Sequence, residues 1–410
     1  MLGAGASVEA GIPDAYEMTK KIIQKVNEPK FPIGPFDKEA PEIKRVINFL
    51  LGGLLFKLGQ TNHNPLQEGV NVEDLFNSVL LLAERDRLEV APFVESWHSM
   101  IDSLDSLNSP RPDLEKIIDA ITEAAAGEAE KRIMTFLRQN YFRRAGSNSR
   151  RIADQLKRAL EANHQKPGRG HIFSRTATRM LMMLGEIVWV NDPTKVEYLI
   201  PIVDRTKKNQ RLLVTTLNYD NTVELIASSQ QLPCNTGIES WSQTGTFDFK
   251  GNGLHLIKLH GSIDWTSQRH AGSRERPMPR TVVSKIDDYI PKQDIDRMGN
   301  DARPPAVIFG QRNKLTSDGP FLDLLRQFQN ELRDSNSLIV IGYSFRDSHV
   351  NTYISQWLNE SPDHILSVID PGFNTSSEEY IKELRRMLRL ENRLKIIEKK
   401  TSEGLQELFA

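Results

Sequence analysis

The segment that most constrains the fold is residues 211–220, an apolar run that ends in Asn-Tyr-Asp. An apolar pattern with helical spacing follows it, which predicts a buried strand leading into a helix. A second run, residues 254–260, ends in a histidine. Loops that leave the carboxyl ends of neighbouring parallel strands line the ligand crevice of an α/β sheet. We therefore expect Asn218 and His260 to face one ligand.

Short apolar runs alternate with helical patterns through the rest of the second half. The further runs predicted to be strands are residues 306–310, 337–342, 364–370 and 394–398. Strands that alternate with helices predict an α/β fold, here a Rossmann-like, doubly wound parallel sheet. Residues 266–305, rich in Arg, Pro, Ser and Gly, are expected to form an irregular excursion at the edge of the sheet.

From about residue 41 to residue 211 the apolar residues recur at helical spacing. We interpret this block as a helical domain inserted into the α/β domain. The expected organisation is a discontinuous Rossmann-like domain of residues 1–30 plus 211–410, and a helical insertion domain of residues 31–210.

The chain begins with a glycine turn, Gly3-Ala4-Gly5, before a second turn at residues 11–14. Glycines permit close backbone approach, and the turn that follows can offer N–H groups to an anion such as a pyrophosphate. A dinucleotide-type turn follows a buried strand, and only Met1 and Leu2 precede these glycines. We expect that strand to lie upstream of residue 1.

Composition excludes several classes of function. Lys and Arg (53) nearly balance Asp and Glu (54) over 410 residues, so no net charge attracts nucleic acid or membranes. The arginines near residues 143–151 are most simply interpreted as part of a solvated loop between helices. The single cysteine, Cys234, cannot build a disulfide or a zinc site of several thiolates. No run is long enough to span a bilayer and no signal segment is present, so we expect a cytoplasmic protein.

Asn218 and His260 have the chemistry of a catalytic pair. Asn offers donors and acceptors for a water or a ribose hydroxyl, and His accepts a proton near neutral pH. Asp220 follows closely enough to support their geometry. A lone histidine is more often a core residue, and this alternative stays open. His255 is expected to point to the opposite face of its strand, and His349 to be a structural residue in the first turn of a helix.

Two later strand ends carry candidate nucleotide contacts. Gly342 allows close approach, while Ser344 and Asp347 are candidate ribose ligands, although Asp347 is equally suited to cap the next helix. Asp370 ends another strand and is a candidate ribose acceptor, with an ordinary turn as the alternative. No metal-ligand spacing links the histidines in the helical block, which are His63, His98, His164 and His171.

Five short motifs occur in the order typical of the sirtuin superfamily, which the chain resembles over about the first thirty residues and most of 211–400. They are Gly-Ala-Gly-Ala-Ser at 3–7, Gly-Ile-Pro-Asp at 11–14, Leu-Asn-Tyr-Asp at 217–220, Lys-Leu-His-Gly-Ser at 258–262 and Gly-Tyr-Ser-Phe at 342–345. Within that superfamily the chain looks most similar to bacterial sirtuin-like NAD hydrolases of anti-phage defence, particularly those paired with a HerA-type ATPase.

The resemblance implies specific roles in binding NAD. The residues expected to cradle the phosphates are Gly3, Ala4, Gly5 and Ser7, and those bordering the nicotinamide pocket are Pro13 and Asp14. By the same resemblance, Asn218 and Asp220 lie beside the nicotinamide ribose and His260 is the catalytic base. Gly261 belongs to the cofactor-binding set, and the adenosine half is served by Gly342, Ser344 and Asp370.

Two departures separate the chain from deacylating sirtuins. Those enzymes usually follow Gly-Ile-Pro-Asp with Phe-Arg, where this chain has Ala15 and Tyr16. They also carry a four-cysteine zinc module after the catalytic histidine, which one cysteine cannot build. We therefore expect no zinc, and another structure in residues 266–305.

The resemblance implies an NAD⁺ hydrolase that releases nicotinamide and ADP-ribose, forms a homo-oligomer, and is regulated with a HerA-type ATPase partner. Two alternatives remain. One is an NAD-dependent deacylase or ADP-ribosyltransferase, and the other is a non-catalytic module that senses NAD or ADP-ribose. Contacts with membranes or nucleic acid are not expected of this chain.

Overall fold

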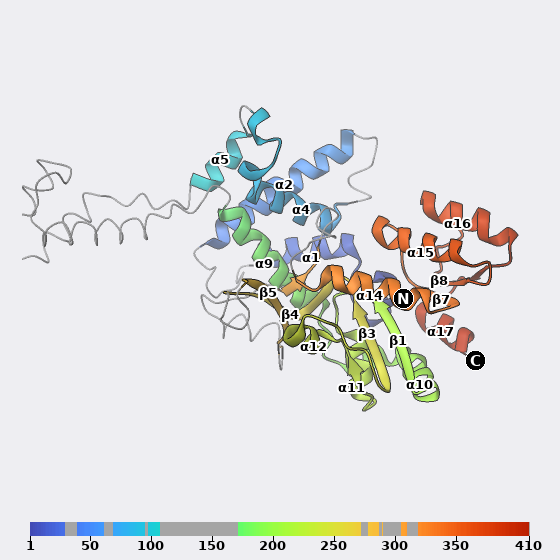
Figure 1. Cartoon of the computed structure of the whole chain (residues 1–410). Coiled ribbons are helices and arrows are strands. Elements are labelled where there is room, and N and C mark those ends of the chain that lie inside the picture. The colour runs from blue at the N-terminus through green and yellow to red at the C-terminus, as the bar shows by residue number, and fades with distance from the viewer. Residues whose placement is uncertain are drawn as a thin grey trace, which may run out of the picture. The chain divides into compact units, whose positions relative to one another are not determined.

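The computed structural model describes residues 1–28, 39–60, 69–94, 97–106, 171–271, 278–286, 289, 305–309 and 319–409 (Figure 1). The arginines near 143–151, His63 and His164 lie outside the described residues. The chain forms two compact units, one made of residues 1–79 and 176–410 and the other of residues 80–175. Both candidate catalytic residues belong to the first unit.

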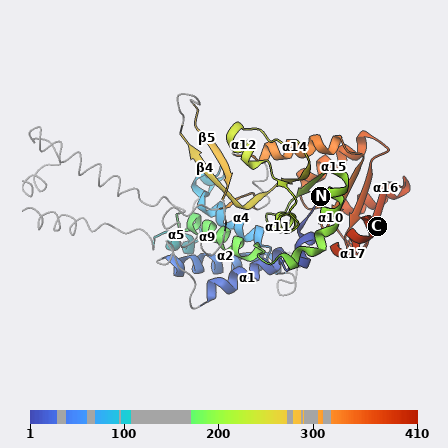
Figure 2. The same cartoon turned by 90° about the horizontal axis from the view of Figure 1, so that it is seen from below.

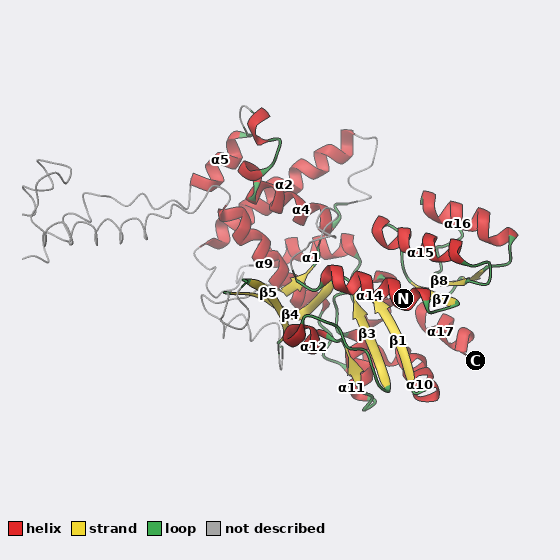
Figure 3. Ribbon diagram, in the orientation of Figure 1, coloured by secondary structure: helices red, strands yellow, loops and turns green. Residues whose placement is uncertain are grey.

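The first unit is built on a parallel β-sheet, as the sequence predicts (Figure 3). One half has the order β1-β3-β2 and the other the order β7-β8-β9. The strands are β1 (Arg211–Thr216), β2 (Cys234–Asn235), β3 (Gly253–Lys258), β7 (Ser337–Ile341), β8 (Ile365–Ile369) and β9 (Leu394–Ile397). All pairs in both halves are parallel. The predicted α/β class is therefore confirmed.

Leu2 joins the two halves into one sheet, because it bridges in parallel to both Thr216 and Ile341. Its N–H donates to Thr215 O at 2.8 Å, and its carbonyl accepts from Leu217 N at 3.0 Å. On the other side, Ile341 N donates to Met1 O at 2.9 Å. The first two residues thus occupy the centre of the sheet, and the glycine turn leaves directly from it.

Helices cover both faces of this sheet (Figure 2). One face carries α14 (Phe321–Arg333) and α15 (Ser348–Glu360), and the other carries α10 (Ile200–Asn209), α11 (Thr222–Ser229) and α17 (Thr401–Phe409). The helix α16 (Glu379–Leu390) follows β8, and the short helix α12 (Ile238–Thr244) follows β2. The apolar stripe of α14 repeats at three- and four-residue spacing, which is why this helix packs along one side.

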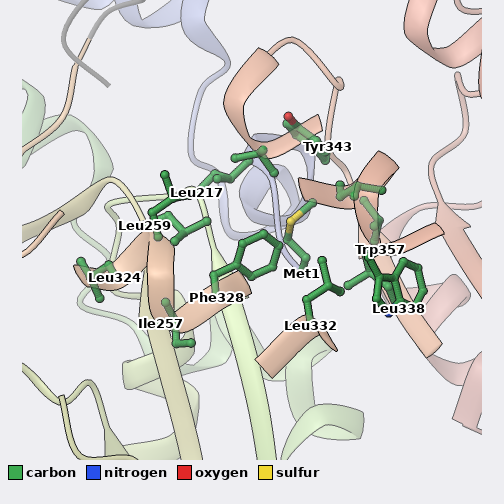
Figure 4. Close-up of a cluster of buried hydrophobic side chains, with 14 of the residues drawn as sticks. Met1, Leu217, Ile257, Leu259, Leu324, Phe328, Leu332, Leu338, Tyr343 and Trp357 are labelled. Atoms are coloured by element: carbon green, nitrogen blue, oxygen red, sulfur yellow. The ribbon is translucent and has the colours of Figure 1, made fainter. Parts of the chain in front are cut away.

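A cluster of buried apolar side chains lies between the sheet and α14 and α15 (Figure 4). Phe328 and Leu332 of α14 meet Ile257 and Leu259 of the β3 segment, together with Trp357 of α15. Each fully buried side chain of this size stabilises the fold by about 1.5–3 kcal/mol. The core therefore holds the strand that leads to His260 against these two helices.

The structure corrects the sequence analysis between residues 261 and 310. A separate antiparallel sheet of order β5-β4-β6 is formed by β4 (Gly261–His270), β5 (Arg280–Lys285) and β6 (Pro305–Val307). The expected strand at 306–310 is thus not part of the parallel sheet, and the described part of 266–305 is not irregular. Polar and apolar residues alternate along residues 262–266, and this two-residue period is typical of a strand.

The block expected to be helical is helical where it is described. Its α-helices are α2 (Ala40–Gln60), α4 (Val72–Ala83), α5 (Ser99–Ser106), α9 (His171–Val188) and α10, and its 3₁₀ turns are η3 (Arg85–Arg87), η4 (Ala91–Phe93) and η5 (Pro193–Leu199). Both η5 and α10 contact the Rossmann-like elements. The domain boundaries at residues 30 and 211 stay a prediction. None of the helices described has the length and apolar character needed to cross a membrane.

Candidate functional site

Two glycine turns meet backbone to backbone at the carboxyl edge of the sheet. Gly5 N donates to Gly342 O at 2.8 Å. A Cβ atom on Gly3 would lie 2.6 Å from the Tyr343 Cα, and one on Gly5 would lie 2.8 Å from the Gly342 Cα. Gly342 itself has φ +58°. No larger residue fits this contact, so the start of the 3₁₀ helix η1 (Ala4–Ala10), which contains Gly5, and the turn after β7 form one unit.

Asn218 binds the first glycine turn with its side chain. Its Nδ2 donates to Gly3 O at 2.8 Å and to Ser7 Oγ at 2.9 Å. Its backbone N–H donates to Thr216 Oγ1 at 3.0 Å, which fixes the loop after β1. Both amide hydrogens are therefore used within the protein, and Oδ1 is the part of the side chain that can accept a hydrogen bond from a ligand.

His260 is buried, with 5% of its surface exposed, and lies next to a second histidine. The centre of its ring is 5.8 Å from the centre of the His349 ring, with a tilt of 37° between the planes. Its carbonyl accepts from Ile308 N at 2.8 Å, which ties it to the antiparallel sheet. His349 stands in the first turn of α15 as expected, but its position beside His260 has no signal in the sequence.

The structure brings Asn218 and His260 to one edge of the sheet. In the β1–β3 pair Thr216 is in register with Lys258, and Leu259 N donates to Thr216 O at 3.0 Å. Each candidate residue lies two positions beyond this last pair. Asn218 contacts the turn before η1, and His260 adjoins the helix that follows the turn after β7.

Asp220 makes local hydrogen bonds with its side chain, and its expected place beside the nicotinamide ribose stays a prediction. Its Oδ1 accepts from Thr222 N at 3.0 Å and from Thr222 Oγ1 at 2.7 Å, so the carboxylate caps the start of α11. The residue is buried, with 6% of its surface exposed. It shapes the loop that carries Asn218, and the buried Lys258 Nζ donates to its carbonyl at 2.5 Å.

The loop after Gly342 is fixed by a buried hydrogen-bond network. Tyr343 Oη donates to Asn351 Oδ1 at 3.0 Å, and Asn351 Nδ2 donates to Phe345 O at 2.7 Å. Phe345 has φ +56°, a left-handed conformation that is costly for a bulky residue. Burial raises the pKa of the Tyr343 hydroxyl, which keeps it a donor. The network also orients the first turn of α15.

The remaining predicted residues lie around this edge. Ala4 and Ser344 are exposed, and Asp347 occupies the N-cap position of α15 without a side-chain capping bond. Asp370 Oδ1 accepts from Gly372 N at 2.7 Å, and burial raises the pKa of its carboxyl. Gly261 begins β4 with φ +79°.

Pro13 and Asp14 lie at the start of α1 (Ala15–Asn27). Asp14 Oδ1 accepts from Tyr16 N at 2.9 Å and from Glu17 N at 2.8 Å, so this carboxylate caps the helix. Its place at the nicotinamide remains a prediction.

Metal-ligating residues do not gather in the part of the chain that is described. There, no three side chains of His, Cys, Asp or Glu stand close enough to hold a metal ion. Burial and the nearby Glu224 raise the pKa of Cys234 to about 12, which disfavours the thiolate.

One family model matches the second half of the chain. Residues 212–390 match the family model described as a SIR2-like domain. Among solved structures, a chain from a study titled "Structural Basis for the Mechanism and Regulation of Sir2 Enzymes" matches with 13% sequence identity, 58% coverage of this chain, 73% coverage of that chain and a TM-score of 0.32. The search of curated proteins found no match. Residues 212–390 are therefore similar in sequence to the SIR2-like domain family.

Proposed function

We propose that this chain is an NAD⁺ glycohydrolase that cleaves NAD into nicotinamide and ADP-ribose. The observation that carries the proposal is the place of Asn218. Its amide bridges Gly3 and Ser7 of the first glycine turn, while His260 ends the neighbouring parallel strand. An acceptor oxygen and an imidazole thus stand at the edge where a dinucleotide would lie across the sheet.

The residues present fit a dinucleotide. Backbone N–H groups and glycines at the first turn suit a pyrophosphate, and a carboxylate at the end of β8 suits ribose hydroxyls. In this arrangement the phosphates contact Gly3, Ala4, Gly5 and Ser7, the adenosine half contacts Gly342, Ser344 and Asp370, and the nicotinamide lies near Pro13, Asp14 and Gly261. The half-buried Asp370 already binds its own turn, so its second oxygen would face the ribose.

Hydrolysis breaks the bond between nicotinamide and ribose, and the electron pair leaves with the nicotinamide nitrogen. A water oxygen bonds to the anomeric carbon, and one proton is released. The transition state carries positive charge on the ribose, as in glycoside cleavage. Asn218 Oδ1 holds the water or a ribose hydroxyl, His260 accepts the proton, and Asp220 maintains the loop through α11.

The test is NAD turnover by the whole chain, with nicotinamide and ADP-ribose measured separately. Asn218→Ala and His260→Ala are each expected to lower the rate by about 10²–10⁴-fold, as general acid–base groups do. Thr352→Ala, an exposed change in α15, serves as the control. Circular dichroism confirms that each variant folds. Activity that survives in both active-site variants would refute the assignment.

The same assay separates the alternatives. O-acyl-ADP-ribose formed from an acyl-lysine peptide would identify a deacylase, and a labelled protein acceptor would identify an ADP-ribosyltransferase. NAD binding without any nicotinamide release would identify a sensing module. We favour hydrolysis because the acyl-transfer reading depends on a zinc module that one cysteine cannot supply.

The biological role we propose is anti-phage defence by NAD depletion. Free hydrolysis of NAD would harm the cell that makes the enzyme, so its activity requires control. We propose that control comes from homo-oligomerisation and from a HerA-type ATPase partner. The support for this is the sequence resemblance and the size of the helical block.

A further inference from the structure

Lys258 is the last residue of β3 and its side chain is fully buried. Its ammonium donates two short hydrogen bonds, one to Asp220 O at 2.5 Å and one to Glu224 Oε1 at 2.6 Å. Lysine is rarely buried unless it is paired, because removing an ammonium from water is costly. The two partners of the ammonium, Asp220 O and Glu224 Oε1, therefore both matter for its role.

The charge of Lys258 is maintained by several carboxylates. Burial alone would lower the pKa of this lysine, but the carboxylates of Glu224, Asp264 and Asp220 outweigh burial and raise it. Glu224 lies in the first turn of α11, and its side chain is 17% exposed. At neutral pH the group is an ammonium that holds a carbonyl on one side and a carboxylate on the other.

The position of this ammonium links the two segments of the candidate site. Lys258 stands two residues before His260 on β3, and Asp220 stands two residues after Asn218 in the loop that follows β1. A backbone hydrogen bond also joins the same two segments, because Ile263 N donates to Tyr219 O at 3.1 Å. One buried group thus holds the amide-bearing loop at a fixed distance from the histidine-bearing strand.

We propose that Lys258 is a positioning residue for catalysis, which sets the place of Asn218 relative to His260 through the carbonyl of Asp220. This inference rests on the proposed NAD hydrolysis and adds a residue to it. Misplacing a reactive group by about 1 Å can cost 10²-fold in rate. Loss of the hydrogen bond from Lys258 Nζ to Asp220 O is therefore expected to lower kcat more than it raises KM.

An ordinary buried ion pair would behave differently from a positioning group. Replacing both members of such a pair by apolar residues of similar volume is often neutral for stability, whereas removing one partner is strongly destabilising. Apolar residues cannot replace the hydrogen bond to Asp220 O. The double variant Lys258→Met with Glu224→Leu therefore separates the two roles.

The experiment uses NAD as the probe and compares the wild-type chain with Lys258→Met, with the double variant, and with a control variant described below. Lys258→Met is expected to lower Tm by roughly 10 °C and kcat by about 10–100-fold. Adding Glu224→Leu is expected to restore most of the Tm while kcat stays low and KM changes by less than about threefold. The double variant regaining wild-type kcat together with its Tm would overturn the proposal.

The control is a second partly buried ion pair in the same unit, Lys25 Nζ to Glu186 Oε2 at 2.6 Å. It joins α1 to α9 and touches none of the site residues. Lys25→Met is expected to lower Tm and to leave kcat unchanged. A loss of kcat in this variant as large as that in Lys258→Met would mean that any lost ion pair slows the enzyme, and would overturn the specific role.

A readout that does not depend on turnover distinguishes this inference from the proposed function. Hydrogen exchange of the backbone amides at residues 217–221 is expected to be at least about tenfold faster in the double variant than in the wild type. If the wild type releases no nicotinamide, the proposed function fails, but faster exchange still supports Lys258 as the tie between these segments. Unchanged exchange would refute it.

Discussion

A single asparagine decides which atoms the site can offer to a ligand. Because Asn218 uses both amide hydrogens on Gly3 and Ser7, the orientation of its amide group is fixed before any ligand arrives. Its oxygen then acts as an acceptor held on a rigid turn, and no rotation is needed during the reaction. An aspartate at this position would keep the shape but would lose both donors.

A second histidine offers a route for the released proton. His260 is buried, whereas the adjoining His349 is only half-buried and stands at a helix N-terminus, where a positive charge is disfavoured. Because the helix N-terminus disfavours an imidazolium, His349 would hold a proton from His260 only in passing and release it to water in the proposed hydrolysis. We expect His349→Ala to lower kcat about tenfold with little change in KM, and added imidazole to restore part of the rate. Wild-type kcat in this variant would contradict the expectation.

The sequence was informative for residues that end strands and uninformative for those that meet across the fold. Asn218 and His260 were found because each interrupts an apolar run, and strand ends of a parallel sheet share one edge. His349 carries no such signal, since its partner lies in a different segment of the chain. The local roles of Asp14 and Asp220 as helix caps also depend on hydrogen bonds that spacing alone does not specify.

At the level of elements, the contact between the two glycine turns is the feature most sensitive to substitution. Gly342→Ala adds a left-handed strain and places a methyl group against the backbone of Gly5 and Ala6. Gly11→Ala is the matched control, because Gly11 has φ +84° but no atom within 4 Å of the added Cβ.

We expect Gly11→Ala to cost only about 1–2 kcal/mol of unfolding free energy, the price of the conformation itself. Gly342→Ala is expected to cost several kcal/mol more, because backbone atoms cannot move aside cheaply. Thermal unfolding and NAD binding measured by calorimetry would check both. Equal losses of unfolding free energy in the two variants would show that the close backbone contact at Gly342 does not contribute to stability.

The antiparallel sheet shows the limit of the sequence analysis at this scale. The strand at 305–307 is short, and its apolar run is indistinguishable from that of a parallel strand. What decides its pairing is β4, whose bulged register between Gly261 and Thr266 takes β6 on one side and β5 on the other. That pairing is set by tertiary contacts, so periodicity could not reveal it.

At the level of the whole molecule, the parallel sheet and the helical character of the described block were both predictable, because each rests on a repeated pattern. No repeated sequence pattern predicts association with other chains, so the homo-oligomer stays a proposal. We expect the purified chain to elute as an oligomer at micromolar concentration in size-exclusion chromatography with light scattering. A monomer under these conditions would contradict the proposed assembly.

The bridge made by Leu2 also constrains when the protein becomes active during synthesis. Its partners Thr216 and Ile341 leave the ribosome long after it does. At about 5–20 residues per second, the glycine turn waits tens of seconds for the turn at Gly342 that completes it. A nascent chain that stops before residue 342 lacks this contact between the two turns. If the chain is the NAD hydrolase proposed above, its activity would therefore begin only after the segment around Gly342 has emerged from the ribosome.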